Sequence, residues 1–162
     1  ENSFEDEGYK QFLGKLLTPL SPHIKPKYTA LDFGCGPAPV LAEMLRERGL
    51  QVDIYDPFYA PFDEALTKSF DIITCTEAIE HFHNPAKEWS MLINMLKPSG
   101  ILAIMTKRVI DRERFKNWHY KNDPTHVSFF SESTFSFLAQ RDGFDINFPS
   151  SDVVLLRKLG AN

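Results

Sequence analysis

The stretch YTALDFGCGPAP, residues 28–39, decides the fold class of this 162-residue chain. A short apolar run ends in two glycines and two prolines, and the next segment, VLAEMLRERG, places its apolar residues on one helical face. The order strand, glycine turn, helix is typical of an open α/β sheet, whose ligands bind beyond the carboxyl ends of the strands. Gly34 and Gly36 would let a ligand approach the main chain, and the helix start offers N–H groups.

The same alternation of strand and helix continues along the chain. It predicts a Rossmann-like, open and mostly parallel sheet with helices on both faces and an antiparallel C-terminal strand pair. The expected strands are residues 51–56, 70–75, 101–106, 144–148 and 153–159, and the expected helices are residues 40–49, 85–100 and 131–144.

The length favours a single domain spanning residues 1–162. Residues 1–27 should form an amphipathic helix, with an apolar period over residues 5–20 and Ser3 or Asp6 as its cap, and a proline-rich extended connection that overlaps its end from residue 18. Residues 107–130 are too long for a plain connection and rich in aromatic side chains, which predicts a cap over an acceptor site. Within it, Trp118 and Tyr120 are the expected acceptor contacts; the alternative is that these aromatics complete the core.

Composition excludes several classes of protein. The formal net charge of -4 provides no broad attraction for nucleic acid, so no DNA partner is expected. No apolar run approaches a membrane span, and the acidic start is unlike a signal peptide. Cys35 and Cys75 lie in apolar stretches, which favours free thiols and a cytoplasmic location. The chain begins with Glu1, which suggests a processed chain or a fragment.

The spacing of the glycine turn distinguishes two cofactors. A dinucleotide fingerprint needs a third small residue where this chain has Pro39, so a nicotinamide-dependent oxidoreductase is disfavoured. The pattern Asp32-x-Gly34-x-Gly36 instead resembles motif I of the class I S-adenosylmethionine-dependent methyltransferases. With FDIITCTEAIEH and LKPSGILAIMT, it resembles a compact branch similar to the ubiquinone-pathway O-methyltransferases.

This resemblance implies a set of residues that bind S-adenosylmethionine. The turn residues would hold the amino acid end of the cofactor, and Asp56, about 20 residues after the turn, would bind the ribose hydroxyls. Pro57 and Phe58 would pack on the adenine and Thr76 would line its pocket, with ordinary loop packing as the alternative. The turn residues meant are Asp32, Phe33, Gly34, Cys35 and Gly36.

Two departures from the family pattern affect this comparison. Ala38 stands where the usual turn has a third glycine. Residues 57–69 are too few for the family's ordinary helix and third strand, so this segment should replace both. The third-strand region is therefore expected to be shortened.

The segment TEAIEHF, residues 76–82, suggests a divalent metal site where the third predicted strand ends. If it starts a helical turn, its two carboxylates and its imidazole share one face, and such ligands suit Mg, Mn, Fe or Zn. The spacing is similar to that of small-RNA 2'-O-methyltransferases, which implies a further histidine ligand downstream. The proposed ligands are Glu77, Glu80, His81 and His126, with His119 and His83 as weaker alternatives to His126.

The sequence therefore predicts an S-adenosylmethionine-dependent methyltransferase that acts on an oxygen of a small-molecule or nucleotide-like acceptor. A metal would lower the pKa of the acceptor hydroxyl, and His81 or His126 would take the proton if no metal is bound. Two alternatives stay open. TEAIEHF is compatible with a solvated helix start, and the domain is compatible with binding S-adenosylmethionine or S-adenosylhomocysteine without catalysis.

Overall fold

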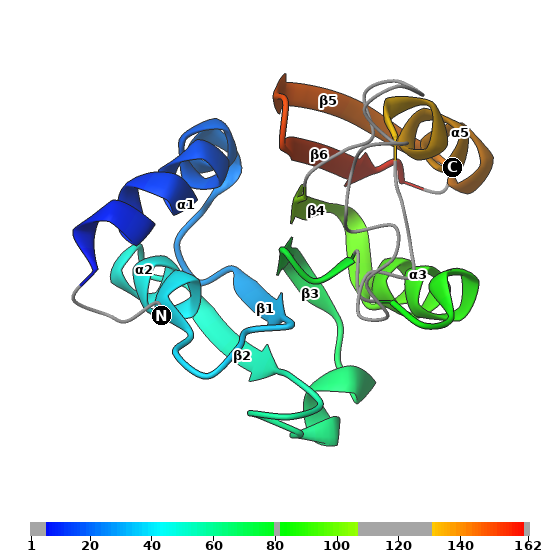
Figure 1. Ribbon diagram of the computed structural model, residues 1–162. Helices are drawn as coiled ribbons and strands as arrows, with labels where there is room; N and C mark the ends of the chain where they lie inside the picture. Colours follow the sequence, from blue (N-terminus) through cyan, green and yellow to red (C-terminus); the bar gives the residue numbers. More distant parts are fainter. Residues whose placement is uncertain (1–5, 80–81, 107–130, 161–162) are drawn as a thin grey trace, which may run out of the picture.

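The computed structural model describes residues 6–79, 82–106 and 131–160. Within these ranges, six strands form one sheet in the order β2-β1-β3-β4-β6-β5 (Figure 1). The first four strands are parallel, while β6 is antiparallel to both β4 and β5. This confirms the Rossmann-like fold with an antiparallel C-terminal pair. In chain order the elements are α1 (Glu7–Leu20), η1 (Ser21–His23), β1 (Thr29–Phe33), α2 (Val40–Glu47), β2 (Gln51–Tyr55), η2 (Asp63–Thr67), β3 (Phe70–Thr76), α3 (Pro85–Asn94), β4 (Leu96–Met105), α5 (Glu132–Asp142), β5 (Phe144–Ser150) and β6 (Val153–Lys158).

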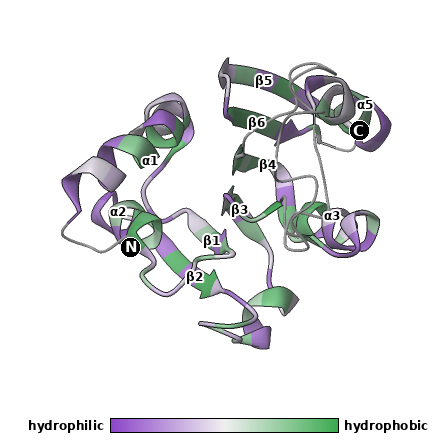
Figure 2. Ribbon diagram, viewed as in Figure 1, coloured by the Kyte–Doolittle hydropathy of each residue, from purple (hydrophilic) through white to green (hydrophobic). Residues whose placement is uncertain are grey.

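Helices cover both faces of the sheet, which gives two apolar core layers. The helices α1 and α2 lie on one face, and α3 and α5 lie on the other (Figure 1). Along β1, Ala30 packs in the α1 layer and Leu31 packs in the α3 layer, as the two-residue period of a strand requires. Figure 2 shows hydrophobic residues along the central strands and mixed character along the helices.

The helix α1 is stabilised both by an N-terminal cap and by an apolar face that packs on the sheet. The Asp6 carboxylate accepts a hydrogen bond from the Tyr9 N–H at 2.9 Å, which satisfies one of the free donors of the first turn. Four leucines of α1 are buried against the sheet, each worth about 1.5–3 kcal/mol; they are Leu13, Leu16, Leu17 and Leu20. In the described part of the chain, no helix has the length and hydropathy that a membrane span requires.

The predicted helical stretch over residues 5–20 is confirmed to its last residue, but the overlapping connection is not extended where we expected it. An extended chain was expected from about residue 18, whereas α1 continues through Pro19 to Leu20 and is followed by the 3-10 helix η1. Pro19 costs the helix one backbone hydrogen bond close to its end. The Leu20 side chain is fully buried, and this burial offsets the loss.

The segment after β2 confirms the shortened third-strand region. Asp56 and Ala60 form an isolated antiparallel bridge, and the chain then makes the 3-10 helix η2 before β3 begins. Among the described residues, β2 is therefore an edge strand of the sheet.

The boundary between α3 and β4 also differs from the prediction. The helix ends at Asn94 rather than near residue 100, and β4 starts at Leu96. The pairing of β3 with β4 has a register shift between Phe70 and Ile72. A side chain at Gly100 would place its Cβ 2.8 Å from the Lys97 carbonyl oxygen, so glycine is required at this irregularity.

Candidate functional site

Two buried carboxylates meet at the carboxyl edge of the sheet. Asp32 on β1 is opposite Ile54 in the parallel register with β2, so Asp56 follows just beyond that level. The Asp56 Oδ2 atom accepts a hydrogen bond from the Gly36 N–H at 3.0 Å. The glycine turn after β1 and the acid after β2 therefore form one connected structure, which we call the β1–β2 rim and define as residues 32–38 and 56–60.

Asp32 is a poorly compensated carboxylate. It is 1% exposed, and the Thr74 hydroxyl of β3 donates a hydrogen bond to its Oδ1 atom at 3.1 Å. Burial raises the pKa of Asp32 from its usual 3.8 to about 7; the Thr74 hydrogen bond opposes this rise, Asp56 adds to it, and Arg46 opposes it. A cationic ligand group beside Asp32 would stabilise the charged carboxylate.

Asp56 has a different environment, because backbone donors surround its carboxylate. Its Oδ1 atom accepts hydrogen bonds from the N–H groups of Phe58 at 2.8 Å and Tyr59 at 3.1 Å, while Oδ2 accepts the Gly36 N–H. A carboxylate has about four acceptor positions. Three are occupied, so roughly one remains for a ligand donor such as a hydroxyl group.

The glycine turn has already used most of its backbone donors. The N–H groups of Gly34 and Cys35 both donate to the Tyr55 carbonyl oxygen, at 2.7 and 3.2 Å. Gly34 has a φ of 78°, and a Cβ atom there would lie 2.5 Å from the Cβ atom of Ala78. The turn therefore packs directly against the segment after β3 and offers few N–H groups to an anion.

The other predicted cofactor residues differ in exposure and in whether their side chains line the β1–β2 rim. The Phe33 ring is in the core, stacked on Tyr55 with centroids 5.3 Å apart, so its side chain does not line the rim. Cys35 is half-buried, and burial, Asp32 and Asp56 raise the pKa of its thiol to about 12. Pro57 and Phe58 are exposed, and Phe58 is 86% accessible and free to stack on a ligand. Thr76 is the last residue of β3.

The predicted metal segment begins with a conformation that we did not expect. Glu77 has a φ of 52°, in the left-handed region, and its N–H donates to the Met105 carbonyl oxygen at 2.7 Å. Because a right-handed helical turn does not begin at Glu77, the argument that placed three side chains on one helical face does not hold there. Among the described residues, no group of three or more potential ligands could hold a metal ion.

Most of the predicted metal and acceptor residues lie outside the described ranges. Of the metal set, only Glu77 is described, and of the alternatives only His83, which is exposed. Neither Cys35 nor Cys75 forms a disulfide, as predicted. The predicted residues outside the described ranges are Glu80, His81, Trp118, His119, Tyr120 and His126.

Sequence reasoning missed two residues near the β1–β2 rim. Thr74 could have been noticed as a hydroxyl inside the apolar run FDIITC, where a buried polar group needs a partner. Tyr9 shares a helical face with Leu13 and Leu16, and its phenol lies within the electrostatic influence of Asp32 and Glu77. Its pKa is raised first by burial and then by these two carboxylates.

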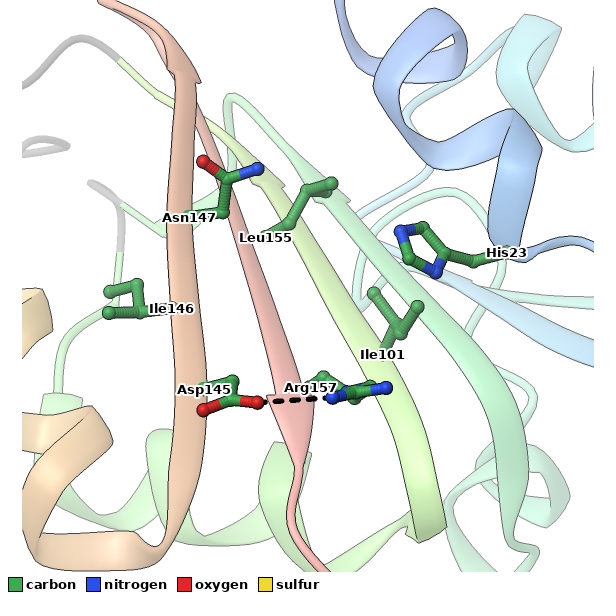
Figure 3. A pocket seen from close by; sticks show the side chains of 7 residues that line it. All are labelled: His23, Ile101, Asp145, Ile146, Asn147, Leu155 and Arg157. Carbon is green, nitrogen blue, oxygen red and sulfur yellow. Dashed lines mark hydrogen bonds and ion pairs between the residues drawn. The ribbon is translucent and has the colours of Figure 1, made fainter.

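A separate groove of about 240 Å³ lies on the other half of the sheet (Figure 3). It is lined by His23 of η1, by Ile101 of β4 and by residues of β5 and β6, among which Asp145 and Arg157 form an ion pair at 3.1 Å. Ile101 is at the level of Ala30, before Asp32 along the strands. The groove is therefore distinct from the β1–β2 rim.

Comparison with known proteins identifies the family. Residues 6–147 match the model of a family described as a methyltransferase domain. The chain belongs to this methyltransferase-domain family. The match covers α1, the β1–β2 rim and the four parallel strands of the described residues, so Asp32 and Asp56 both lie inside the matched region.

Relatives of this family member include O-methyltransferases. The chain is 32% identical over 93 residues to a ubiquinone biosynthesis O-methyltransferase of Nitrosococcus oceani, an alignment covering 57% of this chain and 39% of that protein. The chain thus spans well under half of that relative's length.

Solved structures share the fold at low sequence identity. The Haemonchus contortus phosphoethanolamine N-methyltransferase 2, in complex with phosphomonomethylethanolamine and S-adenosylhomocysteine, has a TM-score of 0.64 and 22% identity, covering 86% of this chain and 38% of that one. A SAM-dependent methyltransferase of Thermotoga maritima has a TM-score of 0.52 and 18% identity, covering 93% of this chain and 95% of that one.

Proposed function

We propose that this chain binds S-adenosylmethionine at the β1–β2 rim and transfers its methyl group to an oxygen of a small-molecule or nucleotide-like acceptor. The observation that carries the proposal is that Asp32 and Asp56 lie at the same edge of the sheet, where the Gly36 N–H joins the glycine turn to Asp56. A poorly compensated buried carboxylate suits the ammonium group of the cofactor, and the remaining acceptor position of Asp56 suits a ribose hydroxyl. The curated O-methyltransferase relatives favour oxygen as the acceptor atom.

The occupied donors of the turn favour this cofactor over a dinucleotide. A pyrophosphate needs several free N–H groups at the helix start. Gly34, Cys35 and Gly36 already donate their N–H groups within the protein, and Pro37 and Pro39 have none. A ligand with a cationic end and a ribose fits these groups better than a dianionic pyrophosphate does.

The divalent metal remains part of the proposal and rests on the resemblance of TEAIEHF to the small-RNA 2'-O-methyltransferases, not on a shared helical face. Glu77, Glu80, His81 and His126 would be its ligands, and Glu77 immediately follows β3, at the edge where Asp32 lies. A bound ion would lower the pKa of an acceptor hydroxyl. Trp118 and Tyr120 would contact the acceptor, and His81 or His126 would take its proton if no metal is bound.

Calorimetric titration tests the proposal. We expect the protein to bind S-adenosylhomocysteine and not NAD, and to form S-adenosylhomocysteine from S-adenosylmethionine when phenols or nucleosides are supplied with Mn²⁺. Binding of NAD alone would overturn the proposal. Binding of S-adenosylhomocysteine without turnover of any acceptor would favour the non-catalytic alternative. Turnover that is the same with and without a metal chelator would show that no metal takes part.

A further inference from the structure

The helix α1 extends to the carboxyl edge of the sheet, where the β1–β2 rim lies. The Lys15 ammonium group is 3.4 Å from the Asp152 carboxylate, and the Asp152 carbonyl oxygen accepts the N–H of Thr106, the residue after β4. Tyr9 lies six residues before Lys15, about 9 Å further along the helix axis at 1.5 Å per residue. The first turns of α1 therefore project over the ends of the parallel strands.

Asp32 points toward this same helix. Side chains alternate along β1, and Ala30 packs in the layer that contains Leu13 and Leu16 of α1, so Asp32 faces that layer too. Tyr9 packs at the border of the same layer and stacks on Phe12, with ring centroids 6.1 Å apart. The helix and the strand thus bring the Tyr9 phenol and the Asp32 carboxylate to one side of the sheet.

Two acidic side chains at this edge of the sheet act on the Tyr9 phenol. Burial, Glu77 and Asp32 raise its pKa, so the phenol stays neutral and can donate a hydrogen bond. Asp32 lies near the end of β1 and Glu77 directly follows β3. The Tyr9 phenol therefore lies near the carboxyl ends of these two strands.

The β1–β2 rim has too few free hydrogen-bond donors for the carboxylate of the cofactor. S-adenosylmethionine carries a carboxylate next to its ammonium group, and this carboxylate needs hydrogen-bond donors near two acidic side chains. In the described turn, Gly34, Cys35 and Gly36 have already donated their N–H groups, and the prolines have none. At most the Ala38 N–H remains, so a donor must come from another element.

We infer that the Tyr9 hydroxyl donates a hydrogen bond to the carboxylate of the cofactor's methionine portion, which makes α1 part of the cofactor site. This inference rests on the proposed function. A neutral phenol in this place binds the carboxylate without competing for the ammonium group, which Asp32 accepts. Tyr9 would therefore set the preference for a ligand with an intact amino acid end.

Tyr9→Phe removes the hydroxyl and keeps the ring, and Tyr28→Phe is its matched control. Tyr28 borders the same apolar layer but precedes β1, at the opposite edge of the sheet. Calorimetry would compare S-adenosylhomocysteine with S-adenosyl-3-thiopropylamine, which lacks only the carboxylate. We expect Tyr9→Phe to weaken S-adenosylhomocysteine binding about ten-fold, to leave the decarboxylated ligand within about two-fold, and Tyr28→Phe to change neither.

The outcomes separate this inference from the proposed function. If the unmodified protein binds S-adenosylhomocysteine and Tyr9→Phe binds it equally well, the role of Tyr9 is wrong and the cofactor assignment stands. Equal losses for both ligands would also overturn the role of Tyr9, because the carboxylate would not be its partner. If the unmodified protein binds neither adenosyl ligand, the proposed function itself is wrong.

Discussion

Asp32 and Asp56 end neighbouring strands at the same edge of the sheet, yet their surroundings differ. The carboxylate of Asp32 is 1% exposed, has one side-chain donor within the described residues and has a pKa raised to about 7. The carboxylate of Asp56 accepts three backbone N–H groups and holds two turns together. The comparison teaches that the charge of Asp32 is poorly compensated within the protein, whereas Asp56 mainly organises two turns and has one remaining acceptor position.

Removal of the Asp56 carboxylate should give the largest effect. Asp56→Ala leaves three backbone donors unsatisfied, which we expect to cost about 3–5 kcal/mol in the free energy of unfolding and to abolish measurable cofactor binding. Urea denaturation and calorimetry would measure the two losses. Asp53→Ala is the control, because within the described residues the Asp53 carboxylate on β2 makes only an exposed ion pair with Lys68, and its loss should cost below about 1 kcal/mol. Similar costs for both variants would contradict the organising role of Asp56.

The glycine turn that joins the two acids gives the next largest effect. Gly34→Ala adds a Cβ atom 2.5 Å from that of Ala78 at a φ of 78°, which should cost about 3 kcal/mol of stability. Gly36→Ala is the matched variant, since its φ is 73° but a Cβ atom there meets nothing within 4 Å. We expect it to cost about 1 kcal/mol from backbone strain alone. Equal shifts of the urea midpoint would show that contact with Ala78 contributes nothing.

Asp32→Asn tests the raised pKa of Asp32 through the pH dependence of stability. The pKa of Asp32 is about 7 in the folded protein and 3.8 in the unfolded chain, so between these values the folded state binds more protons. Stability should therefore fall as pH rises from about 4 to 7, and Asp32→Asn should remove this component of the fall. A stability difference between the two proteins that is constant from pH 4 to 8 would contradict the raised pKa.

The same variant should change cofactor binding in the opposite direction with pH. Only ionised Asp32 attracts the ligand ammonium group, so affinity for S-adenosylhomocysteine should rise as pH increases through about 7. At pH 8, Asp32→Asn should bind about 10-fold more weakly, and the gap should narrow at pH 6. If the difference in affinity between the two proteins is the same at pH 6 and pH 8, Asp32 does not bind the ammonium group.

Thr74→Val gives the smallest expected effect and tests whether the Thr74 hydrogen bond lowers the pKa of Asp32. The Thr74 hydroxyl lowers the pKa of Asp32, so its loss should move the pH midpoint of cofactor binding upward. The cost in stability should be about 1 kcal/mol at pH 8. Thr74→Ser keeps the hydroxyl and should retain the original midpoint in calorimetric titrations. A midpoint that is the same in both variants would show that the hydrogen bond does not act on Asp32.

The sequence predicts the sheet well because its strands are short apolar runs bounded by turn residues. The Asp6 cap of α1 was readable as one of two candidates, because capping depends on residues adjacent in sequence. The irregular start of β4 could not be predicted from the sequence, because it depends on the register between β4 and β3. Pro19 misled the prediction because the burial of Leu20, a tertiary effect, outweighed a local preference.

At the candidate site, the sequence predicted where the two acids lie but not their surroundings. The positions of Asp32 and Asp56 follow from strand order, since both acids end parallel strands. Their different environments do not follow from it, because they arise from Thr74 on β3 and from backbone donors of a non-regular turn. The left-handed conformation of Glu77 is equally a tertiary result, in which its N–H pairs with Met105 of β4.

A crystal structure with bound S-adenosylhomocysteine tests the central claim most directly. We predict that the ammonium group lies within hydrogen-bonding distance of the Asp32 carboxylate and that a ribose hydroxyl donates to Asp56. A nucleoside bound in the groove beside His23, or an adenosyl ligand that leaves both carboxylates without contacts, would contradict the account.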